Sequence, residues 1–349
     1  MTSQQFDYII VGAGSAGCTL ANRLSEMDDA NVLLLEAGGK DTNPWIHIPV
    51  GYLYCIGNPN VDWCFETENE AGLNGRSLGY PRGKVLGGCS SINGMIYMRG
   101  QANDYDQWRQ SGCDGWGWDD VLPHFKKSED YYQGADDLHG SGGEWRVEQA
   151  RIRWEILDAC QDAAEQAGIP KIADFNRGNN EGSSYFAVNQ KRGIRWNTSK
   201  AFLKPALSRK NLELRTHAQV RRLIIENGRV TGVEYDRDGQ TETVHANREV
   251  ILELSGIGRG DILQKHGIDV THESPQVGEN LQDHLQLRCA FKVTGIRTLN
   301  EKATSLLGKA GIALEYLFNQ SGPMSMAPSQ LGIFTKSDAS YETPNLQYH

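Results

Sequence analysis

Three glycines near the start of the chain have the spacing of a phosphate-binding turn. In the pattern G-x-G-x-x-G, the first glycine permits a tight turn, the second lets the backbone approach a pyrophosphate, and the third lets helix and strand pack closely. An acidic residue about 20 positions further on typically binds the ribose hydroxyls, and Glu36 occupies that place. The residue types therefore indicate a dinucleotide site. Its glycines are Gly12, Gly14 and Gly17.

The elements expected around this turn are those that such a site requires. Tyr8–Val11 is a continuous apolar run, which is typical of a buried parallel strand. A helix with apolar residues on one face is expected after the glycines, and a second apolar strand, Val32–Leu35, leads into Glu36. Because a helix N-terminus offers N–H groups and a favourable dipole, phosphates are expected to bind there. The pattern does not separate NAD from FAD, and a glycine-rich turn without a cofactor is the alternative.

A second glycine-rich segment lies at residues 81–108 and reads PRGKVLGGCSSINGMIYMRGQANDYDQW. It combines small residues with Asn93 and a series of backbone N–H donors, which suits a flat polar ring pressed against the main chain. Here the chain resembles the first signature of the glucose–methanol–choline (GMC) oxidoreductases, a family of FAD enzymes. Gly100 and Asp106 continue the likeness, whereas Cys89 stands where the family usually has glycine, serine or threonine.

The likeness covers nearly the whole chain and implies FAD as the cofactor. It is greatest to bacterial FAD alcohol dehydrogenases with a non-NAD acceptor, and choline dehydrogenase comes next. Further matching stretches lie at residues 41–49, 74–78, 195–202, 278–284 and 322–328. The implied cofactor-binding residues are Gly12, Gly14, Ser15, Ala16, Gly17, Glu36 and Ala37 at the ADP end; Val85, Gly88, Asn93, Gly94, Met95 and Ile96 along the flavin ring; and Val220, through its backbone, at the adenine.

Two further features of the site follow from the same resemblance. Some family members tether the flavin through a histidine directly before the asparagine, but Ile92 stands there, so we expect a non-covalent flavin. Alcohol oxidation also needs a base for the hydroxyl proton, and neutral histidine suits that role near pH 7. The family's catalytic histidine is expected beyond His349, so the catalytic residues are unknown. A short small-residue stretch that the family carries after Leu252 is also missing.

Composition excludes several other classes of function. The net charge of −9 without a basic block argues against nucleic acid as a partner. The seven cysteines form no C-x-x-C pair, so neither a metal site nor a disulfide framework is expected. No apolar run is long enough for a membrane helix, and no signal peptide is evident, which favours a cytoplasmic protein. Residues 306–318 are expected to form a helix packed on a sheet, or a peripheral contact with the inner membrane.

The expected fold class is α/β with an α+β second domain. A Rossmann-like FAD-binding domain, with a parallel sheet and a β-meander, would be joined by an incomplete substrate domain built on an antiparallel sheet. Alternation over residues 211–252, with the turn pair Asn227-Gly228, predicts the antiparallel meander. The predicted FAD domain comprises residues 1–45, 80–140 and 195–290, the lid-like connection 46–79, and the substrate domain 145–190 and 291–349.

The function implied by the resemblance is oxidation of a small primary alcohol to an aldehyde, with electrons passed to a quinone or another non-NAD acceptor. Choline dehydrogenase and an oxygen-using alcohol oxidase are alternatives within the family. A lyase or photodecarboxylase on the same fold is a third alternative. A non-catalytic flavin-binding fragment is the fourth, because the catalytic histidine region is absent. The alcohol, the acceptor and the oligomeric state stay open.

Overall fold

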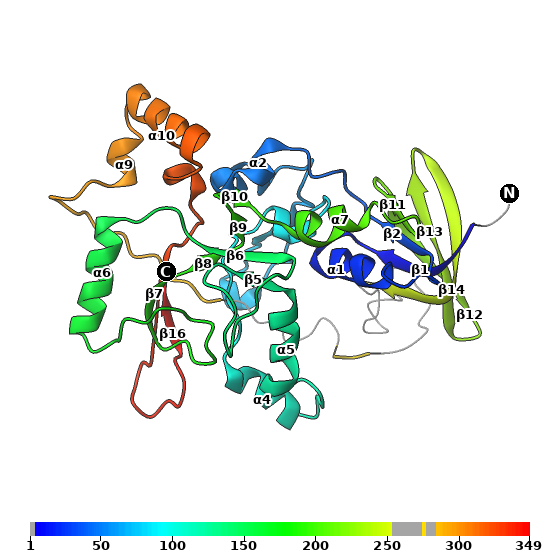
Figure 1. Cartoon of the computed structure of the whole chain (residues 1–349), viewed down its shortest axis with the longest axis horizontal. Coiled ribbons are helices and arrows are strands. Elements are labelled where there is room, and N and C mark those ends of the chain that lie inside the picture. The colour runs from blue at the N-terminus through cyan, green and yellow to red at the C-terminus, as the bar shows by residue number, and fades with distance from the viewer. Residues whose placement is uncertain (1–3, 253–273, 277–283) are drawn as a thin grey trace.

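The computed structural model describes residues 4–252, 274–276 and 284–349 (Figure 1). The stretch predicted to be missing after Leu252, and most of the match at 278–284, lie outside these residues. The helices are α1 (Ser15–Leu24), α2 (Pro44–His47), α3 (Tyr52–Cys55), α4 (Ala102–Gln110), α5 (Trp118–Ser128), α6 (Glu155–Gln166), α7 (Lys204–Ala206), α9 (Leu299–Lys302) and α10 (Leu306–Asn319). Short 3-10 turns η1 (Pro49–Gly51), η2 (Ala71–Leu73), η3 (Gly88–Ser91) and η5 (Pro323–Ser325) and a π-helical turn η4 (Ser199–Leu203) complete them.

A six-stranded sheet positions the N-terminal glycines. Its order is β11-β2-β1-β14-β13-β12, and the first four strands run parallel. Adjacent side chains of β1 point to opposite faces, so Ile10 packs beneath α1 while Ile9 packs against the meander. These strands are β1 (Gln4–Val11), β2 (Val32–Leu35), β11 (Leu212–Arg215), β12 (Gln219–Glu226), β13 (Arg229–Arg237) and β14 (Gln240–Leu252).

The predicted meander is confirmed in part and wrong in one strand. β12, β13 and β14 are antiparallel neighbours, and Asn227 and Gly228 turn the first hairpin with φ of 51° and 75°. β11 does not join them, because it pairs in parallel with β2 at the opposite edge of the sheet. Alternation revealed that Leu212–Arg215 is a strand, but only the tertiary pairing decides its neighbour.

Smaller sheets form the part of the molecule on the left of Figure 1. β7 pairs antiparallel with β15, which pairs with β16, so one sheet unites two ranges predicted for the substrate domain. β16 lies at the edge of this sheet, next to β15. The predicted domain boundaries themselves stay a prediction. The strands are β3 (Phe65–Glu66), β4 (Gly79–Tyr80), β5 (Glu129–Tyr131), β6 (Trp145–Gln149), β7 (Gly182–Tyr185), β8 (Ala187–Val188), β9 (Gln190–Lys191), β10 (Ile194–Arg195), β15 (Leu331–Thr335) and β16 (Leu346–Tyr348).

Helix α10 confirms one expectation and corrects another. The predicted helix exists, but it does not pack on a sheet, since none of its residues is buried. The Tyr316 hydroxyl donates to the carbonyl of Gly193 at 3.1 Å and holds one face near β10. On the other face the exposed fractions of Leu307 and Phe318 are 87% and 77%. Among the described helices, none is both long and apolar enough to cross a membrane.

Candidate cofactor-binding site

The turn between β1 and α1 carries the first glycine pattern. Gly12 has φ of 99°, which only glycine adopts readily, and its N–H donates to the Leu35 carbonyl at 2.8 Å. Helix α1 begins after Gly14 with no side-chain cap and no acidic residue in its first turn. The dipole at this helix end is therefore not offset by a side-chain carboxylate in its first turn, and the end suits an anionic ligand.

Glu36 closes the same turn from the end of β2. Its side chain is buried, and its two oxygens accept the N–H groups of Ala13 and Gly38, both at 2.8 Å. An ionised carboxylate offers about four lone-pair sites, so it can accept further hydrogen bonds from hydroxyl groups. The start of β12 lies beside it, because the Ala218 N–H donates to the Glu36 carbonyl at 2.9 Å. The structure thus brings the region of Val220 close to Glu36.

The two glycine-rich segments are in backbone contact. The Gly87 N–H donates to the Ala13 carbonyl at 2.8 Å. A Cβ atom on Gly88 would lie 2.7 Å from the Cα of Gly14, and Gly88 has φ of 51°. A Cβ atom on Gly38 would lie 2.0 Å from the Lys84 carbonyl oxygen. Such approach is possible only where side chains are absent, so the glycines at these positions are needed for the contact between the segments.

The stretch expected along the flavin ring presents backbone more than side chains. Val85 and Met95 are buried in separate apolar clusters, so only their main-chain groups can face a ligand. Gly94 packs against Pro328, where an added Cβ atom would lie 2.6 Å from the proline ring. Asn93 is the exposed polar residue of the stretch. Their contact with a cofactor stays a prediction.

Arg195 begins the matching stretch 195–202, but its residue type and spacing carry no signal for a role in the site. Its side chain is fully buried, and burial lowers its pKa to about 10. Nε donates to the Ile46 carbonyl at 2.8 Å. Nη1 donates to the Ser90 carbonyl at 3.1 Å and to Oδ1 of Asn93 at 3.0 Å. Nη2 has no hydrogen-bond partner among the described residues.

The residues that follow Arg195 brace the second glycine segment. The hydroxyls of Ser90 and Thr198 lie 2.9 Å apart, and Nδ2 of Asn197 donates to Oγ of Ser91 at 2.8 Å. Asn197 also donates to the buried carboxylate of Asp41 at 3.2 Å. Hydroxyl and amide side chains thus lock this stretch against the segment around Asn93.

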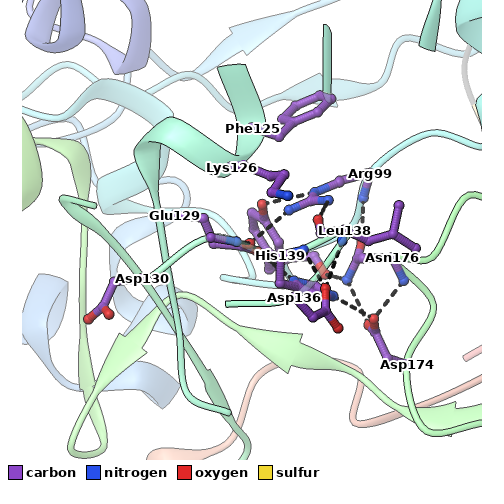
Figure 2. A network of polar contacts seen from close by, with 12 residues as sticks. Arg99, Phe125, Lys126, Glu129, Asp130, Asp136, Leu138, His139, Asp174 and Asn176 are labelled. Atoms are coloured by element: carbon purple, nitrogen blue, oxygen red, sulfur yellow. Dashed lines mark hydrogen bonds and ion pairs between the residues drawn. The ribbon is translucent and has the colours of Figure 1, made fainter. Parts of the chain in front are cut away.

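Figure 2 shows a second polar cluster, which contains Arg99, Glu129, His139 and Asp174. His139 is fully buried, with Nδ1 3.1 Å from both oxygens of Glu129 and Nε2 2.8 Å from Oδ2 of Asp174. Burial by itself lowers the pKa of His139, but the hydrogen bonds to Asp174 and Glu129 outweigh it and raise the pKa to about 9. A buried imidazolium held by two carboxylates does not act as a base near neutral pH. No motif or spacing in the sequence indicates that His139 lies at the centre of a buried ion-paired cluster.

Comparison with known proteins places the chain in a family. A family model described as GMC oxidoreductase matches residues 6–286. The chain belongs to the GMC oxidoreductases. The resemblance and the α/β fold class predicted from sequence are thereby confirmed. Membership of this family implies a flavin cofactor.

Curated relatives of this GMC chain match almost all of it. It is 40% identical to an oxygen-dependent choline dehydrogenase of Photobacterium profundum, over 99% of this chain and 63% of that protein. It is 39% identical to an alcohol dehydrogenase [acceptor] of Pseudomonas putida, over 99% of this chain and 65% of that protein. The chain therefore spans less than two thirds of the length of these relatives.

Solved structures agree with the family assignment. A formate oxidase superposes with a TM-score of 0.82 and 27% identity, covering 98% of this chain and 64% of that one. Pyridoxine 4-oxidase from Mesorbium loti superposes with a TM-score of 0.76 and 36% identity, covering 80% of this chain and 57% of that one.

Among the described residues, no group of three or more His, Cys, Asp or Glu side chains is placed to hold a metal ion.

Proposed function

We propose that this chain binds FAD without a covalent bond, as part of a protein that oxidises a primary alcohol to an aldehyde. Electrons then pass to a quinone or another non-NAD acceptor. The observation that carries the proposal is the backbone contact between the two glycine segments at the turn before α1. This contact joins a dinucleotide turn to a second segment that suits a flat ring. A site for NAD does not require such a second segment.

The residues present fit FAD in their donor and acceptor chemistry. The N-terminus of α1 offers N–H groups to a pyrophosphate, and the Glu36 carboxylate offers acceptors to ribose hydroxyls. Asn93 and the backbone around Gly94 offer polar groups to the ring. Ile92 is 3% exposed and has no nucleophilic atom, so it forms no link to a flavin.

In this proposal the chain binds and orients the cofactor. Bound FAD supplies a two-electron acceptor for the hydride that leaves the alcohol carbon. The proton acceptor for the alcohol hydroxyl is assigned by resemblance to a residue beyond His349. His139 does not replace it, because it is buried between two carboxylates that raise its pKa to about 9. The names of the relatives favour choline, itself a primary alcohol, as one substrate to test.

The test begins with FAD binding by the apoprotein. We expect a yellow holoprotein with a flavin absorption spectrum, and acid precipitation should release all flavin into the supernatant. Colour retained in the precipitate would show a covalent bond and contradict the assignment of Ile92. For the reaction, a protein with the full length of the relatives should reduce an artificial acceptor with primary alcohols or choline. Oxygen uptake at the same rate would instead favour the oxidase alternative.

A peripheral membrane contact, with a cytoplasmic location, is the remaining part of the proposal. The apolar side chains that α10 exposes support it. The protein should then sediment with vesicles of mixed zwitterionic and anionic lipids. Replacement of Leu307 and Phe318 by serine should reduce the bound fraction, and equal binding by this variant would exclude α10 as the contact.

A further inference from the structure

Arg195 is a buried cation without a carboxylate partner. Its guanidinium donates to two carbonyl oxygens and one amide oxygen, and no described acidic side chain forms an ion pair with it. Removing a charge from water is costly unless it is paired. The three hydrogen bonds join neighbouring segments, but they leave the positive charge without a compensating anion, which an electron-rich ligand nearby would supply.

Arg195 also decides how the amide of Asn93 is turned. The oxygen Oδ1 accepts hydrogen bonds from Arg195 Nη1 and from the Met95 N–H, both at 3.0 Å. A guanidinium and a backbone N–H can only donate, so the oxygen of this amide must face them. The reversed orientation would set an NH₂ group against two donors. Nδ2 therefore points away from both, on a residue that is exposed and has no other described partner for Nδ2.

The backbone of the same segment depends on this arginine. The Ser90 carbonyl that accepts from Nη1 belongs to η3, and the Ile46 carbonyl that accepts from Nε belongs to α2. One side chain therefore fixes both the position of the second glycine segment and the direction of its exposed amide donor.

Building on the proposed FAD binding, we propose that Arg195 is a positioning residue for the flavin. It holds the Nδ2 donors of Asn93 toward the bound ring, and its uncompensated charge favours the reduced, anionic ring over the oxidised one. The physical reason is that a fixed donor loses no conformational freedom on binding, and that a positive charge in a poorly solvated site stabilises a neighbouring anion. Arg195 itself need not touch the alcohol.

Asn93→Asp is the most informative variant, because it leaves Arg195 in place. The new carboxylate pairs with the guanidinium, so the thermal midpoint of the apoprotein should equal or exceed that of wild type. The outward donor becomes an acceptor, so FAD affinity in a fluorescence titration should fall at least tenfold. A merely structural role for Arg195 would not separate stability from binding in this way.

Arg195→Met and Arg195→Lys test the charge directly. The methionine variant should bind FAD at least tenfold more weakly. A tenfold smaller preference for reduced flavin lowers the midpoint potential by about 30 mV for a two-electron couple. The lysine variant should keep most of the potential but lose affinity, since one ammonium cannot replace the planar fork. Arg99→Lys, at an equally buried but ion-paired arginine, is the matched control and should leave the potential unchanged.

The outcomes separate this inference from the proposed function. Wild-type protein that takes up no FAD overturns both. Wild-type protein that binds FAD, with Asn93→Asp binding equally well, overturns only the positioning role. If Arg195→Met does not fold, Asn93→Asp decides the matter alone.

Discussion

Arg99 and Arg195 are both buried arginines of the same chain, but their surroundings differ. Arg99 forms an ion pair with Glu129 at 2.9 Å, in a cluster where His139 and Asp174 add one more charge of each sign. Arg195 meets only neutral oxygens. Where charges are matched inside the protein, the cluster is complete without a ligand. Arg195 leaves its positive charge unmatched next to a predicted binding segment, and a bound ligand would account for that charge.

The position of the matched cluster fits a structural role. It ties Arg99, β5 and the loop at Asp174 together, and these come from ranges predicted for both domains (Figure 2). The amide of Asn176 extends the cluster, since its Oδ1 accepts from the Arg99 N–H at 2.7 Å. We therefore expect variants in this cluster to change the unfolding free energy, and variants near Arg195 to change FAD affinity.

The largest expected effect is the loss of unfolding free energy caused by Glu129→Gln. This change keeps the shape but leaves Arg99 and His139 with one carboxylate between them. Loss of one partner from a buried ion pair typically costs about 3–5 kcal/mol of unfolding free energy. Urea denaturation should detect it, while the FAD affinity of the folded fraction stays near wild type. Stability equal to that of wild type would show that the ion-paired cluster around Arg99 does not stabilise the fold.

The pH dependence of stability should reveal the same cluster. The folded-state pKa of His139 is raised to about 9 from an ordinary value of 6.5. The stabilisation is therefore complete below pH 6.5 and is lost as the pH rises through 9. At about 1.4 kcal/mol per unit, the loss is on the order of 3 kcal/mol. Thermal midpoints measured from pH 6 to 10 should fall across this window, and His139→Gln should flatten the curve.

On the binding side of the comparison, Glu36→Gln should have a smaller effect. The amide keeps one acceptor for the backbone N–H groups of the turn but loses the charge that strengthens hydrogen bonds to ribose hydroxyls. Hydrogen bonds to charged groups contribute about 1.5–3 kcal/mol, which weakens FAD binding at least tenfold. Isothermal titration would measure it. An unchanged FAD affinity would show that the ribose hydroxyls of FAD do not bind to Glu36.

The smallest effect is expected at an arginine on the surface. Arg222 on β12 donates twice to Glu234 on β13, at 2.9 and 2.7 Å, and the Arg222 side chain is largely exposed to water. Water and salt screen such a pair, so Arg222→Gln should leave both the thermal midpoint and FAD affinity within replicate error. A marked loss of stability or FAD affinity would mean that burial is not what makes Arg99 and Arg195 more important than Arg222.

The sequence by itself determined the elements whose signals are local. β1, the glycine turn, α1 and β2 follow one another directly, and apolar runs, helical periodicity and glycine spacing all lie within this one unit. The hairpin at Asn227 is equally local, because the left-handed conformation favours those residue types. The likeness to GMC oxidoreductases added the family, the identity of the cofactor as FAD and the residues expected along the flavin ring.

Only the tertiary structure decided which distant residues meet. Asn93 and Arg195 are 102 positions apart, and their hydrogen bond depends on how two segments pack. β11 became a parallel edge strand, and α10 left its apolar face exposed, because pairing and burial are properties of the whole fold. The charge of His139 has the same origin: its pKa is set by burial and by carboxylates brought from other segments, which no spacing in the sequence encodes.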